Sequence, residues 1–318
     1  MNPRFPALLC FLLFVCSPVL RGQVTSAMVG FLKLNLQPGP NFIGFALLPM
    51  MEVQSTFNIS GTDRRLVSLQ GAGITLADGQ FSPGSLPTHA VEIISPGAGL
   101  GFTSVITATA ASGNQLTLAQ EVPAGVSDGA VLKVWKLWRI ADVFGAANSA
   151  GLTSGETPGE ADLILLPDAQ GVTRRFFYSS GGAQGVGWRQ VGGDSTSSAD
   201  VPILLSEGMA ILAKSAKTIL VIGQVKQGNT QISLRTGHNY VANLCPVHAE
   251  GSTLGRRLGT SGLAEGLTGG TSPSLADLVL LWNGRGYDQY YYSTGGLAGA
   301  GWRKVGAGNQ NQETVPLP

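Results

Sequence analysis

The chain has few charged residues. Only 12% of its 318 residues are Asp, Glu, Lys or Arg, about half the share found in an average soluble protein. The formal net charge is +1 at pH 7. A protein that binds nucleic acid or an anionic membrane surface by charge carries an excess of Lys and Arg, which this chain lacks. The composition therefore predicts no nucleic-acid partner.

Cysteine is scarce as well, and this scarcity excludes a disulfide framework. The N-terminus has the pattern of a secretory signal, because Arg4 precedes the apolar run Ala7–Val15, which is too short to span a bilayer as a helix. Residues 1–27 are therefore predicted to be a signal peptide. Two of the three cysteines lie within it, and Cys245 alone cannot form an intrachain disulfide. We expect Cys245 to be a small buried residue on a strand.

Long apolar runs and catalytic motifs are also missing. No run after the signal segment is long enough for a transmembrane helix, so we predict no membrane span. The three histidines, His89, His238 and His248, lie in different segments, and no metalloprotease, serine-hydrolase or metal-binding pattern occurs. These absences predict neither a metal nor a cofactor. They favour a protein without enzymatic activity and leave, as an alternative, a hydrolase whose site the sequence does not reveal.

Glycine, by contrast, is abundant, with 45 residues. The segments Gly181–Gly187 and Gly295–Gly301 share the pattern G-G-x-x-G-x-G, which superficially resembles a nucleotide-binding loop. Such a loop needs a helix directly after the glycines, because the phosphate binds at the helix N-terminus. Here Trp-Arg and a short β-like run follow. We therefore interpret both segments as tight loops between strands.

The two glycine loops belong to an internal repeat. Gly151–Leu166 agrees with Gly266–Leu281 at 10 of 16 positions, and Phe176–Val191 agrees with Tyr290–Val305 at 9 of 16 positions. Repeats at a fixed spacing indicate duplicated structural units. What has been copied is a pattern of strands, turns and a glycine loop, with no obvious catalytic cluster.

An earlier and weaker match indicates where an insertion lies. Leu36–Pro49 resembles Leu234–Pro246 at an offset of 198 residues, whereas Gly151 and Gly266 are 115 residues apart. The difference predicts that the first module carries about 83 additional residues, which we place at about 54–137. We expect a signal peptide at 1–27, a first β module at 28–221 and a second β module at 222–318.

Alternating apolar and polar residues between Gly- and Pro-rich turns predict strands throughout the mature chain. No sustained helical period occurs, although Asp142–Ala147 is compatible with a short helical turn. The insertion contains its own strand candidates and reads as a small β domain. The predicted fold class is therefore all-β: two related β-sandwich- or barrel-like modules with a small β domain inserted in the first. The strand candidates of the insertion are Leu66–Leu69, Ile74–Leu76, His89–Ser95, Phe102–Ala110, Gln115–Ala119 and Val131–Trp138.

Each module is expected to begin with a strand, a G-x-N-[FY] corner and a second strand. The corner residues are Gly39 and Asn41 in the first copy and Gly237 and Asn239 in the second. Glycine accepts positive φ, and an Asn side chain can bond its own nearby backbone. We expect the aromatic residue after the Asn to face inward.

The second module is rich in aromatic residues. Aromatic faces stack on sugar rings and their polar edges tolerate water, so this cluster is a candidate carbohydrate-binding surface. The alternative is that these residues are strand formers paired across a hairpin, which the Phe residues at two equivalent positions of the first module favour. The candidate ligand-binding residues are Trp282, Tyr287, Tyr290, Tyr292, Trp302 and Arg303.

A Trp-Arg pair and a single Asp also recur in both modules. Trp188-Arg189 and Trp302-Arg303 are each expected to pack with the indole beneath the guanidinium. Asp162 and Asp277 recur at strand starts. A single Asp before a strand more often bonds backbone than it ligates a metal, and one acid per module does not make a catalytic acid–base pair.

The second module also stops early relative to the first. Pro318 lies opposite Leu204, so counterparts of the last two strands of the first module, Met209–Lys214 and Thr218–Val225, are not found. The chain is then either a stunted form or a shortened relative of a longer protein. A missing strand pair leaves an open sheet edge that invites pairing with another chain, unless the remaining tail is simply loose.

The combination of G-x-N corner, A-D-[LI] strand, [FY]-[FY]-[YS] run and G-W-R tract resembles a family of uncharacterised, signal-peptide-bearing bacterial proteins. The resemblance covers residues 28–318 approximately. It implies an exported protein, located in the periplasm, at the cell surface or outside the cell after crossing the inner membrane. The family has no established activity, so the resemblance implies no mechanism. The early stop at Pro318 departs from its pattern.

The sequence therefore predicts an exported structural or interaction protein with no identifiable catalytic activity. The alternative is a carbohydrate-binding module that uses the second-module aromatic residues. The expected partners are a polysaccharide or a cell-surface protein, with edge-strand association to another chain as a further mode.

Overall fold

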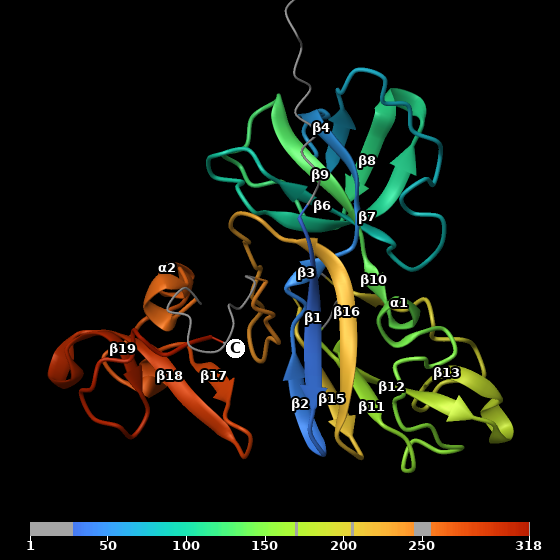
Figure 1. Cartoon of the computed structure of the whole chain (residues 1–318). Coiled ribbons are helices and arrows are strands. Elements are labelled where there is room, and N and C mark those ends of the chain that lie inside the picture. The colour runs from blue at the N-terminus through green and yellow to red at the C-terminus, as the bar shows by residue number, and fades with distance from the viewer. Residues whose placement is uncertain (1–27, 169–170, 205–206, 245–255, 318) are drawn as a thin grey trace, which may run out of the picture.

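The computed structural model describes residues 28–168, 171–204, 207–244 and 256–317 (Figure 1). The predicted signal peptide, Cys245 and His248 lie outside these residues. Most of the secondary-structure elements are strands joined by turns, which confirms the predicted all-β class. The α-helices in the described part of the chain are short: α1 (Ile140–Phe144) and α2 (Leu263–Gly266). None of them combines the length and apolar character that a bilayer-spanning helix requires.

The first module consists of two antiparallel sheets that share one core. One sheet has the strand order β13-β12-β11-β15-β2 and the other has the order β1-β16-β3. Phe176 from the first sheet and Ile219 from the second lie in the same buried cluster, so the sheets pack face to face. The strands are β1 (Val29–Leu36), β2 (Gly39–Ile43), β3 (Leu47–Leu48), β11 (Leu163–Pro167), β12 (Thr173–Ser180), β13 (Val186–Gln190), β15 (Met209–Ala213) and β16 (Lys217–Val225).

A small antiparallel pair completes this core. β10 (Trp138–Arg139) pairs with β14 (Pro202–Ile203), and α1 follows β10 directly. Ile140 and Phe144 of α1 are completely buried in the core. The helical turn expected near residues 142–147 is present but begins two residues earlier, because the Asp142 carboxylate accepts a hydrogen bond from Arg139 N and so caps a helix that starts at Ile140.

The chain leaves the first module after β3 to form a closed barrel and returns at β10 (Figure 1). The barrel has the order β4-β5-β8-β7-β6-β9 and its own buried cluster, which includes Phe57 and Leu116. Its strands, which lie within or beside the insertion expected at about 54–137, are β4 (Met51–Ile59), β5 (Leu66–Leu69), β6 (His89–Ile93), β7 (Thr103–Ala110), β8 (Gln115–Leu118) and β9 (Ala130–Lys136). Residues 74–76 form no strand, contrary to the prediction, and Leu76 instead packs into the barrel core.

A buried ion pair joins the barrel to the residues that follow β16. The Lys226 ammonium lies 2.6 Å from the Glu92 carboxylate of β6, and both side chains are almost inaccessible to solvent. The other Glu92 oxygen accepts a hydrogen bond from the Trp135 indole N–H at 2.9 Å. Removing either partner would leave an uncompensated buried charge, which is strongly unfavourable.

The second module repeats part of the first. Its three strands, β17 (Val279–Trp282), β18 (Tyr287–Thr294) and β19 (Ala300–Lys304), form one antiparallel sheet. Val279 faces Tyr290 as Ile164 faces Phe176 in β11 and β12. The hydrogen bond from Leu258 N to Val315 O likewise corresponds to the bond from Ile140 N to Val201 O. The repeat therefore extends in space from about residue 256 to residue 317.

The second G-x-N corner keeps its local structure but lacks its strands. The Asn239 side chain accepts a hydrogen bond from Arg235 N and donates to Arg235 O and Gly237 O, as Asn41 does with Gln37 and Gly39. The φ angles of Gly39 and Gly237 are +99° and +100°. The prediction of strands on both sides of this corner is wrong for residues 231–243, because no counterparts of β15 and β16 lie beside them in the described residues.

Two further expectations need correction at this boundary. β16 continues to Val225, so residue 221, where the first module was expected to end, lies within a strand. Phe42, the aromatic residue of the first corner, does not face the core. Ile43 and Phe45 fill the core instead, because neighbouring residues on a strand point to opposite faces.

Candidate functional site

The glycine loops are held by the arginine that follows each tryptophan. The Arg189 guanidinium donates to the carbonyl oxygens of Gln184, Val186 and Trp188 at 2.7, 2.8 and 2.9 Å. Arg303 donates to the three equivalent carbonyls of the second module at the same three distances. Each loop contains a 3-10 turn and leads into a strand. The bonded guanidinium N–H groups therefore hold the loop in place, which favours a structural role for the arginine.

The expected packing of indole beneath guanidinium is therefore wrong. Trp188 points into the core, where it lies against Phe144 and Tyr178, and Arg189 points to the other face of β13. Consecutive strand residues cannot share a face, which is the reason the prediction fails. Arg303, a candidate ligand-binding residue, is only 7% exposed and its donors are bound to loop carbonyls.

The structure divides the candidate aromatic residues into two groups. Tyr290 and Trp302 lie in the second-module core and are 5% and 1% exposed. Tyr292 packs edge-on against Trp302, with ring centroids 5.8 Å apart. These rings have no row of open faces to present to a sugar, so their burial favours the interpretation as strand-forming core residues.

Trp282 and Tyr287 form the other group, which lies against the first module. Their ring centroids are 5.3 and 5.4 Å from that of Phe42 on β2, and Tyr240 stacks on the same ring at 6.4 Å. Burial raises the pKa of the Tyr287 phenol above its usual value. These four rings, called the intermodule cluster below, connect the two halves of the repeat.

The recurring aspartates occupy the same backbone position in very different surroundings. In both modules the Asp accepts a hydrogen bond from a threonine N–H nine residues earlier, at 2.7 Å from Thr153 and 2.8 Å from Thr268. Asp162 is 1% exposed and also binds Lys214 N and the Lys217 ammonium. Asp277 is exposed, and no ion pair to it is found among the described residues.

The same difference extends along the strand that follows each Asp. β11 lies between β12 and β15, whereas β17 pairs only with β18 among the described residues. Ile164 of β11 is completely buried, and Val279 in the same position of β17 is only partly buried. Leu278 and Leu280 are 42% and 39% exposed. β17 therefore presents an open edge of unpaired backbone groups beside apolar side chains, which we call the β17 edge.

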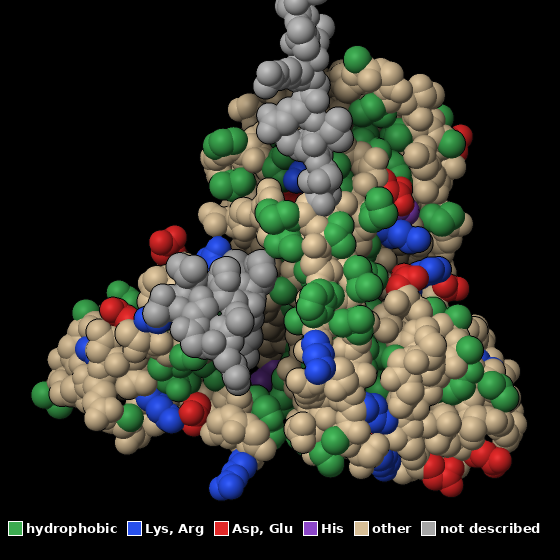
Figure 2. Space-filling model, viewed as in Figure 1, with side chains coloured by type: hydrophobic (Ala, Val, Ile, Leu, Met, Phe, Trp, Pro, Cys, Tyr) green, Lys and Arg blue, Asp and Glu red, His purple; other side chains and the backbone are tan. Residues whose placement is uncertain are grey.

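A second apolar surface lies on the outer face of the β1–β16 pair. Figure 2 shows hydrophobic side chains gathered over these two strands. Phe31 pairs across to Ile222, and these side chains are 74% and 60% exposed. Contiguous exposed apolar surface is uncommon on monomeric soluble proteins and marks contact sites.

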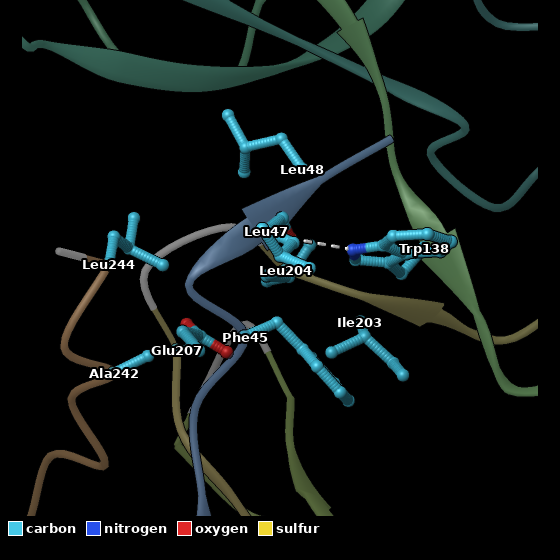
Figure 3. Close-up of a pocket in the computed structure, with 9 residues that line it drawn as sticks. All are labelled: Phe45, Leu47, Leu48, Trp138, Ile203, Leu204, Glu207, Ala242 and Leu244. Atoms are coloured by element: carbon cyan, nitrogen blue, oxygen red, sulfur yellow. Dashed lines mark hydrogen bonds between the residues drawn. The ribbon is translucent and has the colours of Figure 1, made fainter. Parts of the chain in front are cut away.

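A cavity of about 10 Å³ lies between β3 and the residues Ile203, Leu204 and Glu207 (Figure 3), which is room for about one water molecule. Burial raises the pKa of the Glu207 carboxyl at its wall, with Arg235 acting in the opposite direction. An open depression of about 270 Å³ lies near Tyr291 and Leu297. No cluster of three or more potential metal ligands occurs in these residues.

Comparison with known proteins assigns no family. No family model matches the chain, and no curated protein gives a significant match. Among solved structures, VP17, a capsid protein of bacteriophage P23-77, aligns at 12% sequence identity over 67% of this chain and 92% of that chain, with a TM-score of 0.16. A TM-score this low carries no argument about fold or function.

The candidate functional site is therefore the β17 edge, with Asp277 at its start. Of the candidate ligand-binding residues selected from the sequence, β17 contains only Trp282, at its far end. The repeat identified β17 as the counterpart of β11, and the structure shows that no strand of the described residues pairs with its other side. What the sequence could not show was which side chains that edge exposes.

Proposed function

We propose that the chain is an exported structural or interaction protein whose second module binds another polypeptide along the β17 edge. The observation that carries this proposal is the contrast between β11, which is paired on both sides, and β17, which is paired on one side only within the described residues. An unpaired strand with leucines beside it is a template for strand addition, in which main-chain hydrogen bonds supply affinity and side-chain contacts supply specificity.

Two further features support an interaction role. The exposed apolar face of β1–β16 gives the first module a contact surface of its own. The candidate sugar-binding rings Tyr290 and Trp302 are buried, which favours protein contact over carbohydrate binding as the role of the second module. Export, a bacterial family and a location outside the cytoplasm remain part of the proposal, on the basis of residues 1–27 and the repeated motifs.

A photo-reactive residue placed at position 280 tests the interaction role in cells that produce the protein. We expect light to give a discrete cross-linked product that contains a second polypeptide. Leu297 is the matched control, because it belongs to the same module, is 99% exposed and lies away from the edge. Absence of a product at 280, or the same product from position 297, would contradict the proposal.

A further inference from the structure

The first module contains a template for whatever binds the β17 edge. We propose that the ligand is an apolar strand from a different polypeptide, antiparallel to β17, with a lysine placed beyond its end to bind Asp277. This inference rests on the proposed function and specifies the chemistry of the partner. Three features of the first module, compared with the second, support it.

The first feature is the strand that covers β11. β15 lies antiparallel to β11, with Ile211 opposite Ile164 and Ala210 opposite Leu165. Its residues Met209, Ile211 and Ala213 are all buried in the shared core. Because directly opposite residues of an antiparallel pair point to the same face, a partner strand on β17 needs an apolar residue opposite Val279. That side chain would cover the partly exposed flank of the second-module core.

The second feature is a set of acceptors for an ammonium group. In the first module the Lys217 ammonium binds the Asp162 carboxylate, Thr153 Oγ1 at 3.0 Å and Gly151 O at 3.3 Å. The second module has Asp, Thr and Gly at the corresponding positions 277, 268 and 266. It keeps the hydrogen bond from Thr268 N to Asp277, so the carboxylate is already oriented. The Asp and Thr acceptors are thus present in the second module, and no ammonium group is bound to Asp277 among the described residues.

The third feature excludes a reciprocal exchange between two copies. β15 is paired on both sides, with β11 and with β2. Its withdrawal would leave the fully buried Asp162 without Lys214 N and displace the adjoining Lys217 ammonium, and an uncompensated buried charge is strongly unfavourable. Within the part of the chain that the structure describes, a second copy therefore offers no spare strand of this kind. The expected partner is a different chain.

A synthetic peptide with the sequence Met209–Lys217, MAILAKSAK, provides the probe. Titrated into the full-length chain, it should bind saturably, as followed by fluorescence anisotropy of a labelled peptide. Asp277→Asn in the protein, and Lys217→Gln in the peptide, should each weaken binding about tenfold. The two changes combined should weaken it little further, because both remove the same contact.

Glu265→Gln is the matched control, since it removes one exposed carboxylate from the same module and should leave peptide affinity unchanged. Lack of saturable binding up to about 1 mM peptide, or equal affinity of the two peptides, would overturn the inference. So would sedimentation showing that the chain pairs with itself and that Leu280→Lys separates the copies. A cross-link from position 280 without peptide binding would leave the proposed function standing and remove only this partner.

Discussion

At the scale of single residues, the two modules use the same side chains for the same local tasks. Arg189 and Arg303 bind three loop carbonyls each, and Asn41 and Asn239 close the same corner. Every one of these contacts joins residues no more than five positions apart. Such contacts form in both copies of the local sequence, so they do not depend on which strands lie beside them.

Asp162 and Asp277 are the exception, because they occupy the same A-D-L motif but have different neighbours in the folded protein. Asp162→Asn should destabilise the fold by about 3 kcal/mol, since it leaves the Lys217 ammonium without its buried partner. Asp277→Asn should cost less than about 1 kcal/mol, because an exposed carboxylate is already well solvated. Urea unfolding of the two variants and the wild type measures both values. Equal losses of stability would contradict the assignment of Asp277 to an open edge.

At the scale of elements, the difference between β11 and β17 is one neighbouring strand. Strands β12 and β18 are each paired on both sides and keep the same register with their partners. Adjacent aromatic residues are buried in both: Phe176 and Phe177 in β12, and Tyr290 and Tyr291 in β18. The hairpin and the glycine loop therefore fold as one unit, and the missing neighbour changes only the flank of the sheet.

Hydrogen exchange should reveal this flank directly. Amides of β17 that do not pair with β18 should exchange at least about a hundredfold faster than their counterparts in β11, which bond to β15. The central strands β12 and β18 provide the internal reference and should be similarly protected. Exchange measured by NMR or by mass spectrometry of short peptides resolves the two hairpins. Equal protection of β11 and β17 would show that the β17 edge is covered.

At the scale of the whole molecule, the modules meet through the intermodule cluster. Phe42 comes from β2 of the first module and its ring contacts Trp282 and Tyr287 of the second. Aromatic pairs of this geometry contribute roughly 0.5–1.5 kcal/mol each beyond the apolar area they bury. We predicted that Phe42 would face the core of the first module. Its ring instead contacts the second module.

Phe42→Ala should therefore loosen the second module without unfolding the first. We expect a larger radius of gyration in small-angle X-ray scattering, because the ring that Trp282 and Tyr287 pack against is removed. Phe31→Ala is the control, since Phe31 is 74% exposed and lies outside the cluster. Identical scattering from Phe42→Ala and the wild type would show that the cluster does not hold the modules together.

The sequence by itself determined the all-β class, the hairpins, the glycine loops and the hydrogen bonds of the G-x-N corner. These features depend on residues that are close along the chain, and both copies of the repeat carry the same residues. Only the tertiary structure decided that Asp162 is buried and Asp277 exposed, and that Tyr290 fills a core while Tyr287 meets Phe42. Burial depends on which distant strand lies alongside, and the matching positions of the two repeats carry no record of that neighbour.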